Sequence, residues 1–247
     1  MVKNVDYESR RRAVLSAAIN KHIHNAEPVA SEDIAENFDL SPATIRNIFS
    51  ELEEEGYLTH PYTSGGKIPT EKGYRYYVDF LVSQIGILDE EKNNIKREYK
   101  GQMRGLEDAL EETSGIISQA TRYAGIVSFL EWQDKLFYKG LSRILEQKEF
   151  NDPEKVRLLV RALEEKEHLL EIINRDFIID KVKVYIGHEL EYLEMENCSL
   201  VVSGYHKKNK PQGRIAVLGP VRMEYSHAIP VLAYISDVLS DFLENIE

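Results

Sequence analysis

This chain of 247 residues contains one cysteine and no long apolar run, and its first residues do not resemble a leader segment. Its single cysteine, Cys198, cannot form an internal disulfide or supply a cysteine-based zinc cluster. No apolar run approaches the roughly 20 residues that a membrane-spanning helix needs. The first residues carry no apolar signal-peptide core. These absences predict a soluble cytoplasmic protein with no membrane partner.

The motifs of common enzymes are also missing. The sequence contains no glycine-rich phosphate loop, no His-Glu-x-x-His and no nucleophile elbow. His22 and His24 are two residues apart and do not face one another on a helix, so we expect no metal site. Cys198 lies at the mouth of a predicted apolar strand, directly before its first residue, which favours a buried structural thiol over a nucleophile. We therefore expect neither an enzyme nor a cofactor.

Excess positive charge is missing as well. The formal net charge is -11, whereas a nucleic-acid-binding protein is usually basic. The acids are segregated, however, because Glu51, Glu53, Glu54 and Glu55 fall late in a predicted helix. The bases that remain for a DNA-facing side are Arg10, Arg11, Arg12, Arg46, Lys67 and Arg75. We expect weak non-specific binding and salt-sensitive affinity.

The most informative stretch is a predicted helix that starts after Ser41. Ser41 is a good N-cap, and a proline at the next position costs no hydrogen bond. Apolar side chains then recur at three- and four-residue spacing, which predicts one buried stripe. The residues of this stripe are Ile45, Ile48, Phe49 and Leu52.

Short polar residues, an arginine and an asparagine lie off that stripe, in the N-terminal half of the helix. Arg46 can pair with guanine and Asn47 with adenine, and the positive helix end favours phosphate. An ordinary surface helix is the alternative. The predicted DNA-binding residues on this helix are Ser41, Ala43, Thr44, Arg46 and Asn47.

The flanking segments favour the DNA-binding interpretation. Residues 31–38 predict a short helix, and Asp39-Leu40 leave room only for a tight turn, so the pair predicts a helix-turn-helix. Residues 57–60 predict a strand, 61–69 a turn-rich flap with Lys67 at its tip, and Thr70 opens another helix. This arrangement predicts a wing. Its DNA-backbone contacts would be Thr63, Ser64, Lys67 and Arg75.

The pattern of elements predicts an α+β protein with these divisions: residues 1–86 as a winged helix-turn-helix domain, 87–122 as a linker or dimerisation helix, and 123–247 as a domain with an antiparallel sheet. Residues 89–119 predict one long helix, which either leads to a dimer interface or folds back on the second domain. A further helix is expected from Pro153 to about Asn174. Strands are expected at 124–129, 135–138, 181–186, 199–205 and 214–218, and a last helix at 226–245.

Several motifs, in this order along the chain, resemble the HrcA family of heat-inducible transcription repressors. The N-terminal motifs are Ala43-Thr44-Ile45-Arg46-Asn47, Glu51-Leu52-Glu53 to Gly56-Tyr57-Leu58, and the Pro61 to Arg75 segment with its Gly66-Lys67-Ile68-Pro69-Thr70 core. The later motifs are Leu145-Glu146-Gln147-x-Glu149-Phe150, Ile186-Gly187-x-Glu189, Asn197-Cys198-Ser199 and the Gly213 to Ser226 segment.

This resemblance implies a winged helix-turn-helix followed by a GAF-like domain that carries an inserted dimerisation segment. It also implies a homodimer on an inverted repeat in double-stranded DNA upstream of chaperone genes. The resemblance further implies chaperonin as a partner and a stress response in which heat relieves the repression. The chain departs from the family in two places. Between Phe129 and Leu141 it has a short connection where the family has a much longer segment, so the GAF-like domain is reduced. Lys67 replaces the usual arginine of the wing and loses its bidentate geometry.

A DNA-binding repressor is therefore the leading hypothesis. The alternative is a regulatory or protein-interaction module that senses a ligand or a chaperone, in which the winged helix docks protein. An enzyme would need a deep pocket with Cys198 beside a histidine.

Overall fold

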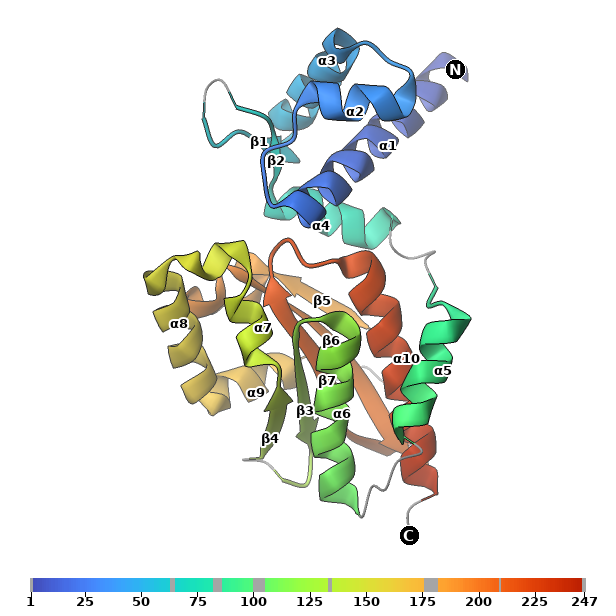
Figure 1. Ribbon diagram of the computed structural model, residues 1–247, viewed down its shortest axis with the longest axis vertical. Coiled ribbons are helices and arrows are strands. Elements are labelled where there is room, and N and C mark those ends of the chain that lie inside the picture. The colour runs from blue at the N-terminus through green and yellow to red at the C-terminus, as the bar shows by residue number, and fades with distance from the viewer. Residues whose placement is uncertain are drawn as a thin grey trace. The chain divides into compact units, whose positions relative to one another are not determined.

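The computed structural model describes residues 2–62, 65–81, 86–99, 105–132, 135–175, 182–208 and 210–245. The chain divides into two compact units, residues 1–84 and 85–247, each with its own elements (Figure 1). None of the helices in the described ranges has the length and apolarity that crossing a bilayer requires.

The first unit contains a helix-turn-helix followed by a wing. Its elements are α1 (Val2–Asn25), α2 (Ser31–Phe38), α3 (Pro42–Glu54), β1 (Leu58–Thr59), β2 (Ile68–Pro69) and α4 (Glu71–Tyr76), which a π-helical turn, Tyr77–Leu81, continues. Asp39 takes a left-handed conformation, with φ 51°, and its N–H donates to the carbonyl of Ala35. This residue closes α2 and makes the tight turn that the sequence predicts.

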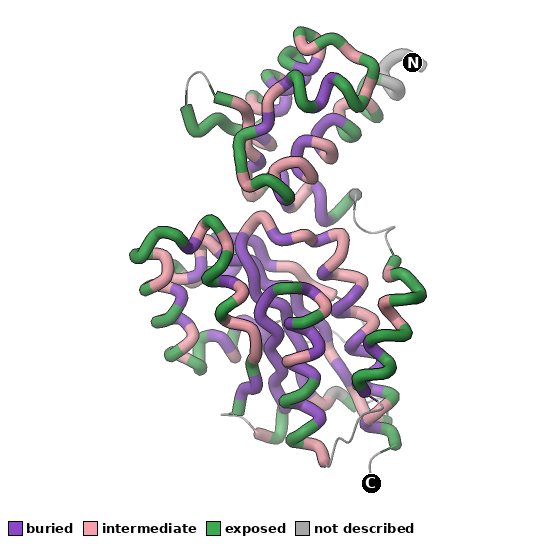
Figure 2. Tube along the Cα trace, viewed as in Figure 1, coloured by how far each residue is buried: buried purple, intermediate pink, exposed green. Residues whose placement is uncertain are grey.

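The core of this unit forms where the predicted stripes of the helices meet. α1 buries one apolar face along its length, and α2 adds Ile34 and Ala35. The stripe of α3 is buried as predicted, so its opposite side is turned outward (Figure 2). The residues that α1 contributes to the core are Val14, Leu15, Ala18, Ile19 and Ile23.

The wing is held on both sides of its return strand. Leu58 pairs with Pro69 and Thr59 with Ile68, while Lys67 bridges to Val29 through hydrogen bonds of 2.8 and 2.9 Å. The prediction that Lys67 lies at the tip of the wing is therefore wrong, because this residue lies at its base. Gly66 permits the close approach, since a Cβ there would lie 2.6 Å from the Val29 carbonyl oxygen.

The second unit is built on an antiparallel sheet with the strand order β4-β3-β7-β6-β5. Its strands are β3 (Ala124–Phe129), β4 (Leu136–Lys139), β5 (Lys183–Ile186), β6 (Cys198–Lys207) and β7 (Lys210–Pro220). Its helices are α5 (Asp89–Tyr99), α6 (Leu106–Thr121), α7 (Leu141–Leu145), α8 (Pro153–Glu164), α9 (Lys166–Asn174) and α10 (Tyr225–Glu244). The antiparallel sheet and the winged N-terminal unit confirm the α+β prediction.

Helices cover both faces of this sheet (Figure 1). One face, which includes Ile126, Leu200 and Leu218, packs against α7, α8 and α9. The other face packs against α6 and α10. At Gly125 the backbones of β3 and α6 approach so closely that a Cβ would lie 2.1 Å from the Ser114 carbonyl oxygen.

The predicted single helix over residues 89–119 is wrong. α5 ends at Tyr99 and α6 begins at Leu106, and Gly105 between them has extended backbone, with φ 165°. The hydroxyls of Tyr99 and Thr113 lie 2.8 Å apart, whereas fourteen residues of straight helix would hold them about 21 Å apart. The segment therefore folds back on the second unit. Its role in dimerisation stays a prediction.

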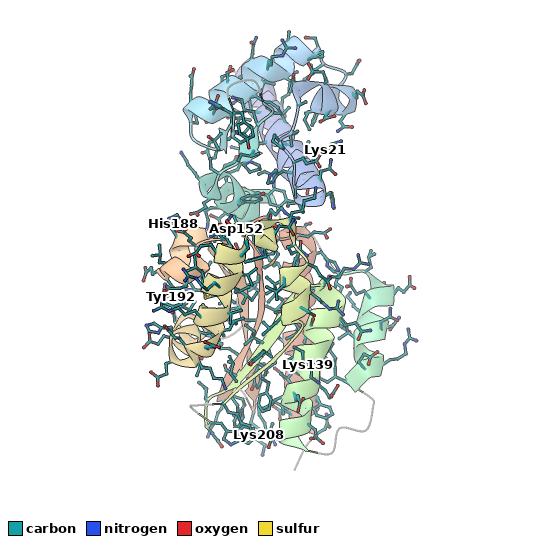
Figure 3. The ribbon with its side chains drawn as sticks, turned by 60° about the vertical axis from the view of Figure 1, so that its left-hand side comes forward. Lys21, Lys139, Asp152, His188, Tyr192 and Lys208 are labelled. Carbon is teal, nitrogen blue, oxygen red and sulfur yellow. The ribbon has the colours of Figure 1, made fainter. Side chains whose placement is uncertain are left out.

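The predicted helix from Pro153 to Asn174 is also interrupted. Asp152, labelled in Figure 3, caps α8, and its Oδ1 accepts from the Glu154 N–H at 2.9 Å. The backbone leaves helical geometry at Glu165, with φ -83° and ψ 64°. The bend lets apolar residues of both α8 and α9 reach one core, and these are Leu159, Ala162, Leu169, Ile172 and Ile173.

Candidate nucleic-acid interface

The start of α3 is fixed by the cap that the sequence predicts. The Ser41 hydroxyl accepts from the Thr44 N–H at 3.1 Å, and the two hydroxyls lie 2.9 Å apart. Pro42 occupies the first helical position. The cap stabilises the first turn and engages Thr44, so Ser41 and Thr44 act locally as a pair.

The outward side of α3 carries the predicted polar residues. Ala43, Arg46 and Asn47 are exposed and Thr44 is half-buried. We call these residues the reading face. Its guanidinium and carboxamide are groups that pair bidentately with guanine and adenine edges in a major groove. The face also lies at the positive end of the helix, which favours an anionic partner.

Arg46 does not extend freely into solvent. Its Nη2 lies 3.1 Å from Glu32 Oε1, and its Nε donates to the Ser31 hydroxyl at 3.3 Å. The Glu32 backbone N–H, then the Ser31 hydroxyl, then Arg46 hold the pKa of the Glu32 carboxyl below its usual value. Both side chains of the ion pair are well exposed, so a phosphate or a base can compete for the guanidinium.

A groove of about 430 Å³ lies beside Arg46. Its walls come from α3, from the start of α2 and from the base of the wing. Its polar lining includes Ser31, Glu32, Arg46, Ser50 and Lys67. The groove brings two cations and one carboxylate from three separate segments together.

Lys67 forms an ion pair with Glu53, in the last turn of α3. Glu53 also contacts the Nδ1 of His60. The hydrogen bond from Lys67, followed by that from His60, holds the pKa of the Glu53 carboxyl below its usual value. Lys67 is mostly shielded, with a side chain 20% exposed, but an ammonium group has three donors and can bind a second acceptor.

Two other predicted cations, Arg75 and Arg11, also meet carboxylates. Arg75 pairs with Asp79 at 3.2 Å. Arg11 lies 2.5 Å from Glu55 and 3.0 Å from Glu8. Arg11 therefore ties α1 to the end of α3. Thr63 and Ser64, predicted as wing contacts, lie outside the described residues.

The sequence did not show that the acids at the end of α3 bind distant segments, because their position late in the helix indicated only that they lie away from the DNA-facing bases. Glu51 accepts from the Tyr7 hydroxyl at 2.7 Å, Glu55 from Arg11, and Glu53 from Lys67. Their partners lie as many as 44 residues away in the sequence. The only signal in the sequence was the density of acids beside a helix end.

The second unit shows no reaction centre among its described histidines and its cysteine. Cys198 is buried, and burial raises its pKa to about 12, which confirms a structural thiol. His188 is exposed on the turn after β5 (Figure 3). In the described part of the chain, no group of three or more His, Cys, Asp and Glu residues could hold a metal ion.

Two family models match the chain. Residues 7–79 match the winged helix-turn-helix transcription repressor model, HrcA DNA-binding, and residues 128–229 match the HrcA protein C-terminal domain. A crystal structure described as a hypothetical protein aligns over 95% of this chain and 98% of its own length, with a TM-score of 0.75 and 19% identity. That likeness supports the fold.

Full-length relatives agree with the family models. The heat-inducible transcription repressors HrcA of Carboxydothermus hydrogenoformans and Geobacter sulfurreducens are each 28% identical to this chain. The alignments cover 96% and 97% of this chain, and 98% and 99% of the relatives.

Each alignment runs over 338 positions, more than the 247 residues of this chain. The relatives therefore carry residues that this chain lacks. Both the residues of the winged unit and those of the sheet unit match the same family, in the same order. The chain belongs to the HrcA family of winged helix-turn-helix transcription repressors.

Proposed function

We propose that this chain represses heat-inducible genes by binding an inverted repeat in double-stranded DNA as a homodimer. The observation that carries the proposal is the reading face, which α3 turns outward while its opposite stripe is buried. The relatives are named heat-inducible transcription repressor HrcA, which supports heat-inducible genes as the class that this chain controls. Acting on DNA, the protein would work in the cytoplasm, with chaperonin as a proposed partner in its control.

Arg46 and Asn47 are proposed to read base edges, with Thr44 orienting the contact. Ser41 and Ala43 would lie against the DNA at the positive helix end. Arg46 would exchange Glu32 for a base or a phosphate, at low cost because that ion pair is exposed. The proposed backbone contacts are Thr63, Ser64, Lys67 and Arg75.

A homodimer follows from the symmetry of an inverted repeat, since two half-sites need two reading faces about one DNA turn apart. Residues 87–122 are the proposed dimerisation segment. Because the relatives carry residues that this chain lacks, a further surface of this chain would take their place in the dimer. The division into a DNA-binding part, residues 1–86, and a control part, residues 123–247, is proposed on the same grounds.

The test is a gel-shift titration against DNA from upstream of the chain's own gene. Arg46→Ala should weaken binding by about 5- to 150-fold, the effect of losing a base contact worth about 1–3 kcal/mol. Arg157→Ala, which removes an exposed arginine of α8, is the matched control for the charge change. Equal affinity of Arg46→Ala and the control would overturn the proposed role of the reading face.

The dimer is tested with the same DNA. Sedimentation analysis should show two chains on an intact inverted repeat, and scrambling one half-site should leave only weak binding. One chain bound per intact repeat would contradict the homodimer.

A further inference from the structure

One carboxylate closes the wing across its base. Glu53 Oε2 accepts from the Lys67 ammonium, and Glu53 Oε1 contacts the Nδ1 of His60. His60 directly follows β1 and Lys67 directly precedes β2. The two oxygens of a single side chain on α3 therefore bind the two arms of the wing.

The backbone pairing between the two strands of the wing is short in the described residues. In the part of the chain that the structure describes, the β1–β2 ladder consists of two residue pairs, Leu58 with Pro69 and Thr59 with Ile68. An isolated hairpin is marginal in water even when it is longer. The bridge from Lys67 to Val29 anchors the return arm only. The other arm is anchored before β1, where the Tyr57 N–H donates to the Leu52 carbonyl at 2.8 Å, and beyond β1 it contacts Glu53 through His60.

The shielding of this carboxylate strengthens the contact. The side chains of Glu53 and Lys67 are 28% and 20% exposed, against 66% and 62% for Arg46 and Glu32. Solvent screens a partly shielded ion pair less than an exposed one. Glu54, the next residue, is exposed and carries the same charge.

We propose that Glu53 is a positioning residue for DNA binding, which couples the wing to the recognition helix α3 so that both meet the duplex as one preformed surface. This inference rests on the proposed DNA-binding function. Glu53 itself need not touch DNA. It holds Lys67 beside the groove that also contains Arg46, and an ammonium held in this way keeps donors for a phosphate.

The proposal predicts an effect opposite to that of simple electrostatics. Removing a carboxylate near DNA ordinarily strengthens binding, because repulsion from phosphates is lost. Glu53→Gln should instead weaken specific binding by about tenfold, because the wing must then be ordered at the moment of binding. Glu54→Gln makes the same change of charge one residue away and should bind as tightly as wild type or slightly more tightly.

The first measurement is fluorescence anisotropy on the upstream DNA fragment, paired with hydroxyl-radical footprinting. Glu53→Gln should lose protection at the flanks that the wing covers and keep protection at the sites of α3. Both variants should keep a cooperative thermal unfolding transition well above the temperature of the binding assay, which separates positioning from loss of fold. Equal affinities and equal footprints for the two variants would overturn the proposal.

The second measurement needs no DNA, so it separates failure of this inference from failure of the proposed function. Tyr62 in the wing is 74% exposed and is a chymotrypsin site. Cleavage there should be several times faster in Glu53→Gln than in wild type or Glu54→Gln. Equal cleavage rates would show that Glu53 does not hold the wing, whatever the DNA results. Faster cleavage in a protein that binds no DNA would support the role of Glu53 in holding the wing and would overturn the proposed DNA-binding function.

Discussion

Arg46 and Glu32 meet across the turn of the helix-turn-helix, with Arg46 Nη2 3.1 Å from Glu32 Oε1. The arginine that is proposed to read DNA is thus held by a carboxylate of the neighbouring helix. A base or phosphate that binds the Nη2 of Arg46 would compete with this carboxylate. The pair also lowers the local positive potential, in keeping with a chain whose net charge is -11.

Glu32→Gln should therefore strengthen DNA binding by about two- to fivefold at low salt, because the competitor of Arg46 loses its charge. The gain should shrink as salt is raised. Anisotropy titrations at several salt concentrations measure both effects. Glu36→Gln, at an exposed position of the same helix, controls for net charge, and weaker binding by Glu32→Gln would show that the pair prepares Arg46 rather than restrains it.

Arg222→Ala should destabilise the second unit by about 1–3 kcal/mol, because a mostly shielded ion pair would lose one partner. The Arg222 guanidinium donates to Glu149 Oε2 at 3.1 Å and to Gln147 at 3.0 Å, and its side chain is 11% exposed. Arg222→Lys should recover only part of the loss, since lysine lacks the planar fork. Urea unfolding gives the difference.

The control for that measurement is Arg157→Ala. Arg157 pairs with Glu154 on the surface, with a side chain 74% exposed, and its loss should change stability by no more than about 0.5 kcal/mol. If Arg222→Ala and Arg157→Ala have the same free energy of unfolding, the Arg222 ion pair does not add the stability that its burial predicts.

Gly125→Ala should destabilise the second unit by about 3 kcal/mol, because the new Cβ would lie 2.1 Å from the Ser114 carbonyl oxygen and force α6 away from β3. Gly115→Ala in α6 is the contrasting change. Its Cβ would meet only the flexible Lys139 side chain, at 3.3 Å. The higher helix propensity of alanine should raise the free energy of unfolding by as much as about 1 kcal/mol. Opposite shifts of the urea midpoint are expected, and shifts of the same sign would refute the packing argument.

The Cys198 thiol should resist thiol reagents in the native protein at pH 8 and react once the chain is unfolded, since burial raises its pKa to about 12. A raised pKa contributes stability below the unfolded value of about 8.5, and that contribution is lost as the pH rises from there toward about 12. Timed labelling in the absence and presence of urea measures the protection. Rapid labelling without urea would contradict the buried position.

Local patterns in the chain were enough for much of the winged unit. The Ser41 cap, the proline after it and the stripe from Ile45 to Leu52 depend on spacings of a few residues, and the structure confirms each. The strands of the second unit were likewise predicted to within a few residues of their ends, because they are apolar runs bounded by turns. The breaks at Gly105 and Glu165 were missed, because each depends on the core that the following helix must reach.

The sequence alone was enough to predict which residues lie on the reading face and in what order, since a capped helix with one apolar stripe leaves one polar side. It did not show which acid each base would meet. Glu53 meets Lys67, Glu55 meets Arg11 and Glu32 meets Arg46 only after distant segments pack together. Ion pairing depends on distances of a few ångströms between side chains, and the packing of the helices and the wing sets those distances.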